Sequence, residues 1–415
     1  MAMSKEMNSG PDALPIGILD GMRVIEASAF VAAPLGGMTL AQLGADVIRF
    51  DPIGGGVDYR RWPLAPDGQS LYWSGLNKGK RSIALDLASE EGQRIASRLI
   101  TAPGEGGGLF LTNLPARGPL AYEALRAVRP DLVMVSVTGD PDGSSQVDYT
   151  VNASTGYPWL TGPPNADGPI NSVLPAWDIA TGTLAAIGLL AGERSRLRTG
   201  RGRLIEIALS DVALAMVANL GRFAAAELGV PQEEREGNHL YGAFGHDFST
   251  RDGHRLMVVA ITGRQWTALC RATATIEPVE ALERATDLDL RTESDRYAAR
   301  ERIVGLLAPW FASRDLPEIG ECLTKHHVTW ATYQTISEMV DHDPRASLAN
   351  RMFAEVEHPG VGRYRMPATP LRITGSQRAV RRAPILGEHT DEVLAGILGM
   401  STTEIAILHD DRIVA

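Results

Sequence analysis

The sequence predicts an α/β protein in which a doubly wound, Rossmann-like parallel sheet is accompanied by a smaller α+β domain. The first observation is that strand-like and helix-like segments alternate over residues 22–137, which is typical of a parallel sheet with helical crossovers. The second is a change of composition after residue 230. Charged helical segments and one hairpin signal, Asp252-Gly253, replace the alternation there.

A βαβ unit is predicted at the start of the large domain. Residues 22–27 and 46–51 resemble strands, and residues 36–43 resemble a helix with Gly44 as its stop signal. Asp51 stands at the end of the second strand, where dinucleotide-binding proteins hold a ribose. The connecting loop ASAFVAAPLGG lacks the G-x-G-x-x-G that lets a pyrophosphate approach the backbone. We therefore expect this fold without an NAD site.

The alternation continues through the rest of the large domain. The next predicted elements are helices at residues 89–100 and 121–128 and strands at residues 108–112 and 132–137. A Gly-, Pro- and Asn-rich stretch, residues 148–173, is expected to be a long loop, and long loops inside domains tend to be functional. The elements expected after it are a helix of buried composition, a strand and an apolar helix, at residues 181–191, 204–209 and 210–229.

The changes of pattern divide the chain into segments. We expect a disordered tail over residues 1–17, the first part of the large domain over 18–229 and the small α+β domain over 230–330. The tail mixes charged residues with Pro and Gly and has no apolar core, so it resembles neither a secretory signal nor a membrane anchor. Within the small domain GNHLYGAFG, residues 237–245, is either a plain surface loop or a mobile loop over a site.

Composition excludes several classes of protein. The 415 residues carry a net charge of −10, which argues against a nucleic-acid partner because phosphate binding needs a basic surface. No segment is long and apolar enough to span a bilayer. The two cysteines, Cys270 and Cys322, cannot build a disulfide framework and show no metal-ligand spacing, so we expect no metal and a reducing cytoplasm.

Asp178 is the candidate catalytic residue. It begins the predicted buried helix within PAWDIATGTLAAIGLLAGERSRLRTGRGRLIEIALSD, residues 175–211. As an N-cap, its carboxylate would accept hydrogen bonds from the first free amides of the helix. The same helix end also holds a carboxylate ionised and oriented, which a carboxylate nucleophile needs. Position alone leaves both interpretations open.

A basic and aromatic stretch over residues 53–81 is the candidate binding segment. It contains Arg60, Arg61, Lys78, Lys80 and Arg81 interleaved with Tyr59, Trp62, Tyr72 and Trp73. One interpretation is a solvated surface loop anchored by a few aromatic side chains. The other is a cradle for a phosphorylated nucleotide, in which cations pair with phosphates and aromatic faces stack on a base.

Four sequence blocks occur in an order known from one family. They are LDGMRVIEASAFVAAP with LAQLGADVIRFD, then LNKGKRSIALDL, then the Asp178 helix with TGRGR, and finally RAPILGEHTDEVL. In this order they resemble the family III CoA-transferases over most of the chain, most weakly over residues 229–328. The family's fold implies that residues 331–415 return to the large domain. It also implies an interlocked homodimer.

The resemblance implies a site for the CoA moiety of an acyl-CoA substrate. Asp178 matches the catalytic acid, and the CoA contacts carried over fall at Val31, Ala32, Asn77, Lys78, Lys80, Asn113, Leu114 and Arg117. Two positions depart from the pattern: Pro52 stands where many relatives have Arg, and Thr138 where some have Lys. The segment TGDPDG lacks the histidine motif of the family's racemases, which argues against racemase activity.

The resemblance also implies a reaction. GGGVDYRRWP, VLPAWD and NHLYGAFG are similar to a branch that moves CoA from one carboxyl group of 2-methylfumaryl-CoA to the other, giving 3-methylfumaryl-CoA through an aspartyl-CoA thioester. No cofactor beyond CoA is expected. An intermolecular CoA-transferase would use the same Asp178 but release its acid, whereas a non-catalytic acyl-CoA-binding protein would not need Asp178.

Overall fold

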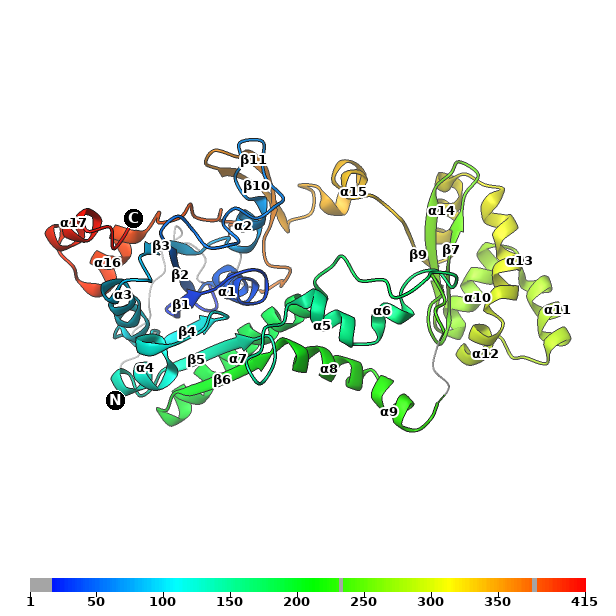
Figure 1. The fold of residues 1–415 in the computed structure, drawn as a ribbon. Helices are drawn as coiled ribbons and strands as arrows, with labels where there is room; N and C mark the ends of the chain where they lie inside the picture. Colours follow the sequence, from blue (N-terminus) through cyan, green and yellow to red (C-terminus); the bar gives the residue numbers. More distant parts are fainter. Residues whose placement is uncertain (1–16, 231–233, 375–378) are drawn as a thin grey trace, which may run out of the picture. The chain divides into compact units, whose positions relative to one another are not determined.

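The computed structural model describes residues 17–230, 234–374 and 379–415 (Figure 1). The chain forms two compact units. The first takes the chain up to Thr155, then Ser172–Val230 and Pro344–Ala415; the second comprises Gly156–Asn171 and Pro231–Asp343. The predicted disordered tail lies outside the described residues, except for Gly17.

The first unit is built on a six-stranded sheet in the order β3-β2-β1-β4-β5-β6, in which all neighbouring strands are parallel. The strands are β1 (Arg23–Ala27), β2 (Asp46–Pro52), β3 (Arg81–Leu85), β4 (Leu109–Thr112), β5 (Val133–Thr138) and β6 (Arg203–Ala208). The parallel α/β sheet expected from the sequence is therefore confirmed. The strand order reverses between β1 and β4, and ligands of such sheets bind at the carboxyl ends of the strands flanking this point.

Helices cover both faces of this sheet (Figure 1). On one face α1 (Ala32–Leu43) and α7 (Ala176–Thr199) share a core with the strands. The helices of the opposite core are α3 (Glu90–Thr101), α4 (Tyr122–Val128), α16 (Thr390–Leu398) and α17 (Thr402–Asp410). Each core consists of apolar side chains removed from water, which is the main favourable contribution to folding.

Helices α1 and α7 touch through their backbones near their first turns. A Cβ atom on Gly182 would lie 2.5 Å from the carbonyl oxygen of Ala32, and one on Gly36 would lie 2.9 Å from the carbonyl oxygen of Gly182. Only glycine permits this approach. The contact places the first turn of α7, with Asp178, beside the loop that follows β1.

Three predictions of local structure need correction. Residues 148–173 are not one loop, because they contain α5 (Asp148–Ser154) and α6 (Tyr157–Leu160). The apolar helix after residue 210 is two helices, α8 (Leu209–Asn219) and α9 (Arg222–Glu227), since Gly221 between them has φ of +81°. Helix α7 is buried on one face only, and Ile187 on another face is 53% exposed.

The first unit is completed by short elements. They are α2 (Leu71–Leu76), the 3-10 helices η1 (Gly118–Leu120) and η2 (Pro344–Ala346), and the antiparallel hairpin β10 (Phe353–His358) and β11 (Gly362–Pro367).

The second unit has a separate antiparallel sheet and its own core. The sheet order is β7 (Phe244–Ser249), β8 (Arg255–Ala260) and β9 (Thr329–Thr332). Its helices, besides α6, are α10 (Gly263–Ala272), α11 (Ile276–Thr286), α12 (Glu293–Ala298), α13 (Arg300–Ala312), α14 (Leu316–Lys325) and α15 (Ile336–His342). The predicted hairpin is confirmed, with Gly253 at φ +85° between β7 and β8. Among the described residues, no helix has the length and hydropathy needed to cross a membrane.

Candidate active site

Asp178 lies in the first turn of α7, but it does not cap that helix. It is the third helical residue, and the capping carboxylate belongs to Asp148, the first residue of α5. Asp148 Oδ2 accepts hydrogen bonds from the backbone N–H of Trp177 at 2.8 Å and of Asp178 at 3.1 Å. The N-cap interpretation of Asp178 is therefore wrong, because Asp148 already occupies the first amides of the helix.

The carboxylate of Asp178 is left without a donor. It is half-buried, and no described residue donates a hydrogen bond to it. Burial, reinforced by the nearby charge of Asp148, raises the pKa of Asp178 to about 6, and the positive charge of Arg61 opposes that rise. A carboxylate that is partly desolvated and unpaired has the properties of an oxygen nucleophile near neutral pH.

Arg61 and Tyr72 interact electrostatically with this carboxylate, and Arg61 also lies beside the ring of Phe30. The Arg61 guanidinium carbon lies 5.3 Å from the ring centroid of Phe30 and 5.3 Å from that of Tyr72. Burial, with the charge of Asp178 adding to it, raises the pKa of Tyr72 to about 12, so this hydroxyl keeps its proton. Arg61 is therefore the cation whose charge acts on Asp178, and its guanidinium lies beside two aromatic rings.

The loop after β1 is fixed across the switch point by Asn113. The Asn113 side chain accepts a hydrogen bond from Ala29 N at 2.8 Å and donates one to Ala29 O at 2.7 Å. Phe30, the next residue, has φ of +63°, an uncommon conformation for a residue other than glycine. Asn113 thus acts on the loop that carries Val31 and Ala32, which precede and begin α1.

Of the eight predicted CoA contacts, five lie on the loops that follow β1 and β4. They are Val31, Ala32, Asn113, Leu114 and Arg117. Arg117 is exposed and Leu114 is half-buried. The structure therefore gathers these residues at the switch point, and their contacts with CoA stay a prediction.

Asn77 and Lys80 belong to a buried ionic group that we call the Arg49 cluster. Its members are Glu26, Arg49, Asp51, Asp58, Asn77 and Lys80, all at most 4% exposed. Lys80 Nζ uses its three donors on Glu26 at 2.7 Å, Pro34 O at 2.9 Å and Asn77 at 2.9 Å. Burial lowers the pKa of Lys80 to about 8, with Glu26 opposing that change. Lys80 therefore has a structural role here, and contact between CoA and Asn77 or Lys80 stays a prediction.

Arg49 holds the cluster together. Its guanidinium donates to Asp51 at 2.7 and 2.8 Å and to Asp58 at 3.0 and 3.1 Å. It also donates to Ser28 O at 2.8 Å, in the loop that carries Phe30. Burial disfavours its charge, but the surrounding carboxylates keep the pKa of Arg49 above its ordinary value. Both carboxylate oxygens of Asp51 accept hydrogen bonds from Arg49, so this carboxylate is engaged in the cluster.

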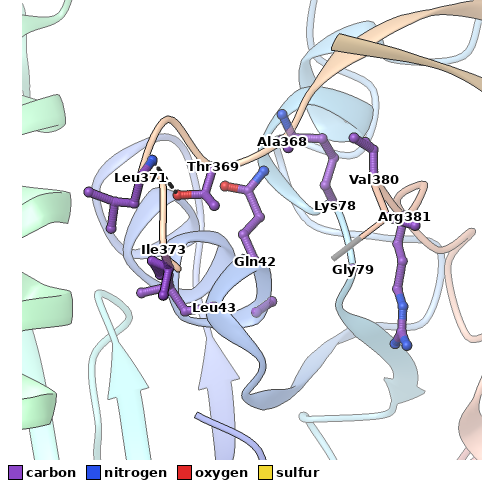
Figure 2. A pocket seen from close by; sticks show the side chains of 12 residues that line it. Gln42, Leu43, Lys78, Gly79, Ala368, Thr369, Leu371, Ile373, Val380 and Arg381 are labelled. Carbon is purple, nitrogen blue, oxygen red and sulfur yellow. Dashed lines mark hydrogen bonds between the residues drawn. The ribbon is translucent and has the colours of Figure 1, made fainter. Parts of the chain in front are cut away.

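Lys78 lies in a different recess from Asn77 and Lys80 (Figure 2). The recess is formed by the end of α1, the residues just before β3 and residues after β11. Lys78, Gln42, Thr369, Leu371 and Arg381 are among the side chains that line it. Lys78 Nζ donates to Pro367 O at 3.1 Å, and burial lowers the pKa of Lys78 to about 8. A contact of Lys78 with CoA stays a prediction.

The sequence did not indicate the part that three residues of this region play in the site. Asp148 fell in a predicted loop, Arg49 in the middle of a strand, and Arg61 in the basic stretch without a link to Asp178. An acid placed two residues after Gln146 and thirty before Asp178 carries no local signal of a cap. Arg49 had one signal, since a charged residue inside an otherwise apolar strand requires a partner when it is buried.

The described residues contain no group of His, Cys, Asp and Glu suited to hold a metal ion.

Comparison with known proteins places the chain in a family. The family model of CoA-transferase family III matches residues 19–390. The chain is 55% identical to 2-methylfumaryl-CoA isomerase of Chloroflexus aurantiacus, over 96% of this chain and 98% of that protein. It is 28% identical to succinyl-CoA–D-citramalate CoA-transferase of the same organism, over 95% and 98% of the two chains. A crystal structure of a CaiB/BaiF family protein from Brucella suis superposes with a TM-score of 0.75 at 27% identity, covering 92% of this chain and all of that one. The chain belongs to CoA-transferase family III.

Proposed function

We propose that the protein converts 2-methylfumaryl-CoA to 3-methylfumaryl-CoA by transferring CoA within one substrate molecule. The observation that carries the proposal is the 55% identity to 2-methylfumaryl-CoA isomerase over nearly the full length of both chains. The unpaired Asp178 carboxylate supplies the nucleophile that such a transfer requires.

The first half of the reaction releases the acid. An Asp178 oxygen attacks the C1 thioester carbonyl, a C–O bond forms, and the C–S bond breaks to give a mixed anhydride and CoA thiolate. The thiolate then attacks the Asp178 carbonyl and expels the C1 carboxylate. The products are an aspartyl-CoA thioester and the free dicarboxylate, mesaconate.

The second half repeats these steps from the other end. The C4 carboxylate attacks the aspartyl-CoA carbonyl and expels the thiolate, which then attacks C4 of the new anhydride and frees the Asp178 carboxylate. Charge and atoms balance without an oxidant, a reductant, a metal, a flavin or a nicotinamide. Each developing oxyanion needs hydrogen-bond donors, for which backbone amides of the loops after β1 and β4 are suitable.

An isotope experiment tests whether the transfer is intramolecular. We expect turnover with 2-methylfumaryl-CoA alone, and no incorporation of label from added ¹³C-mesaconate into 3-methylfumaryl-CoA, as measured by mass spectrometry. The Asp178→Asn variant serves as the control for non-enzymatic exchange. Label that enters the product in step with turnover would replace this proposal with intermolecular transfer, the activity named for the 28% identical relative.

We further propose that the active form is a homodimer. Helix α7 and the residues that end α8 and α9 present apolar side chains to solvent in the single chain, with Ile187 53%, Leu220 69% and Leu228 80% exposed. Strand β6 is an open edge of the sheet. Exposed apolar side chains next to an open sheet edge favour a subunit interface, and the family resemblance implies the same partner, a second copy of the chain.

Sedimentation tests the dimer. We expect a species of twice 44.6 kDa at micromolar concentration, and we expect the Ile187→Glu, Leu220→Glu double variant to dissociate or fail to assemble. The Val128→Glu variant changes another exposed apolar side chain, 69% exposed on α4, and should stay dimeric. A wild-type monomer with full activity would contradict the proposal.

A further inference from the structure

Arg61 is an exposed cation at the candidate active site, and it has no anionic partner within the described part of the chain. Among the described residues, no carboxylate lies within salt-bridge distance of its guanidinium, whereas the buried Arg49 is bonded to two carboxylates. Arg61 is also the cation whose charge acts on Asp178. An arginine with a free planar fork beside a reacting carboxylate is suited to bind a second carboxylate in bidentate fashion.

The position of Arg61 is held from two sides. Phe30 and Tyr72 each place a ring centroid 5.3 Å from its guanidinium carbon. Phe30 is itself fixed, because Asn113 holds the preceding residue, Ala29, through both of its backbone polar groups. The left-handed φ of +63° at Phe30 has a conformational cost that surrounding contacts must offset. The loop therefore maintains an unfavourable backbone conformation whose result is an aromatic face over Arg61.

The aromatic contacts orient the guanidinium without neutralising it. Rings attract a cation through their negative faces but leave its N–H groups free to donate in the guanidinium plane. Arg61 therefore keeps a charged fork whose N–H groups can donate to an acceptor supplied by a ligand.

We propose that Arg61 binds the carboxylate of the substrate that is not reacting, and that it retains free mesaconate while the two carboxyl groups exchange places. This inference rests on the proposed function. When 2-methylfumaryl-CoA binds, its C4 carboxylate lies on Arg61 and its C1 thioester meets Asp178. After the first half-reaction both ends are carboxylates, so the molecule turns around by exchanging them between Arg61 and the reacting position.

The test separates retention from chemistry. Wild type, Arg61→Gln and Arg61→Lys are compared with the Arg126→Gln variant, which removes an exposed arginine of α4. With 2-methylfumaryl-CoA we expect Arg61→Gln to lower kcat/KM by about 10- to 100-fold, because a charge-assisted bidentate bond is lost. Arg61→Lys keeps the charge without the fork and should lie between. The Arg126→Gln variant should behave as wild type.

Label from free mesaconate gives the second readout. In Arg61→Gln the acid should escape before it turns around, so ¹³C-mesaconate enters the product in a fraction of turnovers where wild type shows none.

The third readout is formation of aspartyl-CoA from tiglyl-CoA, which carries a methyl group in place of the far carboxylate. Its rate, followed by intact protein mass, should agree within about twofold between wild type and Arg61→Gln, since no carboxylate is present for Arg61 to bind.

The possible outcomes are distinct. Label entering the wild-type product at every turnover would overturn the proposed function itself. A wild type that excludes label, together with an Arg61→Gln variant that also excludes it at unchanged kcat/KM, would overturn only the role of Arg61. Equal loss of rate with tiglyl-CoA and with 2-methylfumaryl-CoA would mean that Arg61 acts on Asp178 or on folding, and this would also overturn the inference.

Discussion

The acids of the Arg49 cluster are buried and Asp178 is half-buried, and their hydrogen-bonding environments are opposite. Asp51 and Asp58 receive paired donors from Arg49, and Glu26 receives Lys80. Asp178 receives no donor, since the helix amides next to it are taken by Asp148. The first arrangement fixes the loops, and the second leaves one carboxylate available for reaction.

The difference shows how one fold separates stability from reactivity. A buried charge is tolerated when paired and hydrogen-bonded, and removal of one partner leaves the others uncompensated. An unpaired carboxylate instead shifts its pKa upward, as Asp178 does. Donors on Asp178 would lower its nucleophilicity, because they would have to be released before it attacks a carbonyl. Arg49 and Lys80 pair with the neighbouring acids and not with Asp178.

The largest expected effect comes from removal of Asp178. Asp178→Asn and Asp178→Ala should lower kcat by at least about 10⁴-fold, because the covalent pathway has no other nucleophile. Calorimetry should find CoA binding and folding preserved. Glu123→Gln, on the exposed surface of α4, provides the matched acid control. Turnover near the wild-type rate in either Asp178 variant would remove this residue from the mechanism.

The next largest effect concerns the paired acids. Arg49→Met leaves Asp51 and Asp58 buried without their cation and should lower the free energy of unfolding by about 3–5 kcal/mol. Arg94→Met removes an arginine that is 58% exposed and paired with Glu91, and it should cost less than about 1 kcal/mol. Urea denaturation measures both. Equal losses would mean that burial of the Arg49 cluster has no energetic consequence.

A smaller effect is expected of Asp178 on the pH dependence of the free energy of unfolding. Its folded pKa of about 6 lies above the unfolded value, so the stability that its protonated form contributes is present below about pH 4 and is lost as pH rises through 6. Asp178→Asn removes this dependence and should make the protein more stable than wild type at pH 8, by about 1–3 kcal/mol. The two proteins should converge near pH 4. A variant that is less stable than wild type at pH 8 would contradict the unpaired state of Asp178.

The smallest effect concerns the influence of Asp148 on the pKa of Asp178. Transfer should fall about tenfold per pH unit below pH 6 as Asp178 becomes protonated. Asp148→Asn keeps an oxygen acceptor for the helix amides but removes the charge that raises the pKa of Asp178, so the acid limb should move to lower pH by less than about one unit. The pH profile of kcat/KM measures the shift. A limb that moves to higher pH would show that Asp148 does not raise the pKa of Asp178.

Much of the fold was predictable because its signals are local. Strands β1, β2, β4, β5 and β6 and the hairpin of the second unit were expected within a few residues, since apolar alternation and turn residues act over short distances. Asp178 was also identified from its local context and from a motif. The helices within residues 148–173 were missed, because Gly and Pro there indicated a loop and tertiary packing of Val151 and Trp177 against α8 favours helix.

The sequence by itself determined the parallel sheet, the helix that begins near Asp178 and the acid suited to be a nucleophile. Only the tertiary structure decided that Asp148 caps that helix, that Arg49 and Lys80 pair with buried acids, and that Arg61 has no carboxylate partner among the described residues. Asn113 acts on Ala29 from 84 residues away, and Asp148 acts on Asp178 from 30 residues away. Chemical character at this site depends on which partners meet in space, and no local pattern specifies that for groups so far apart in the chain.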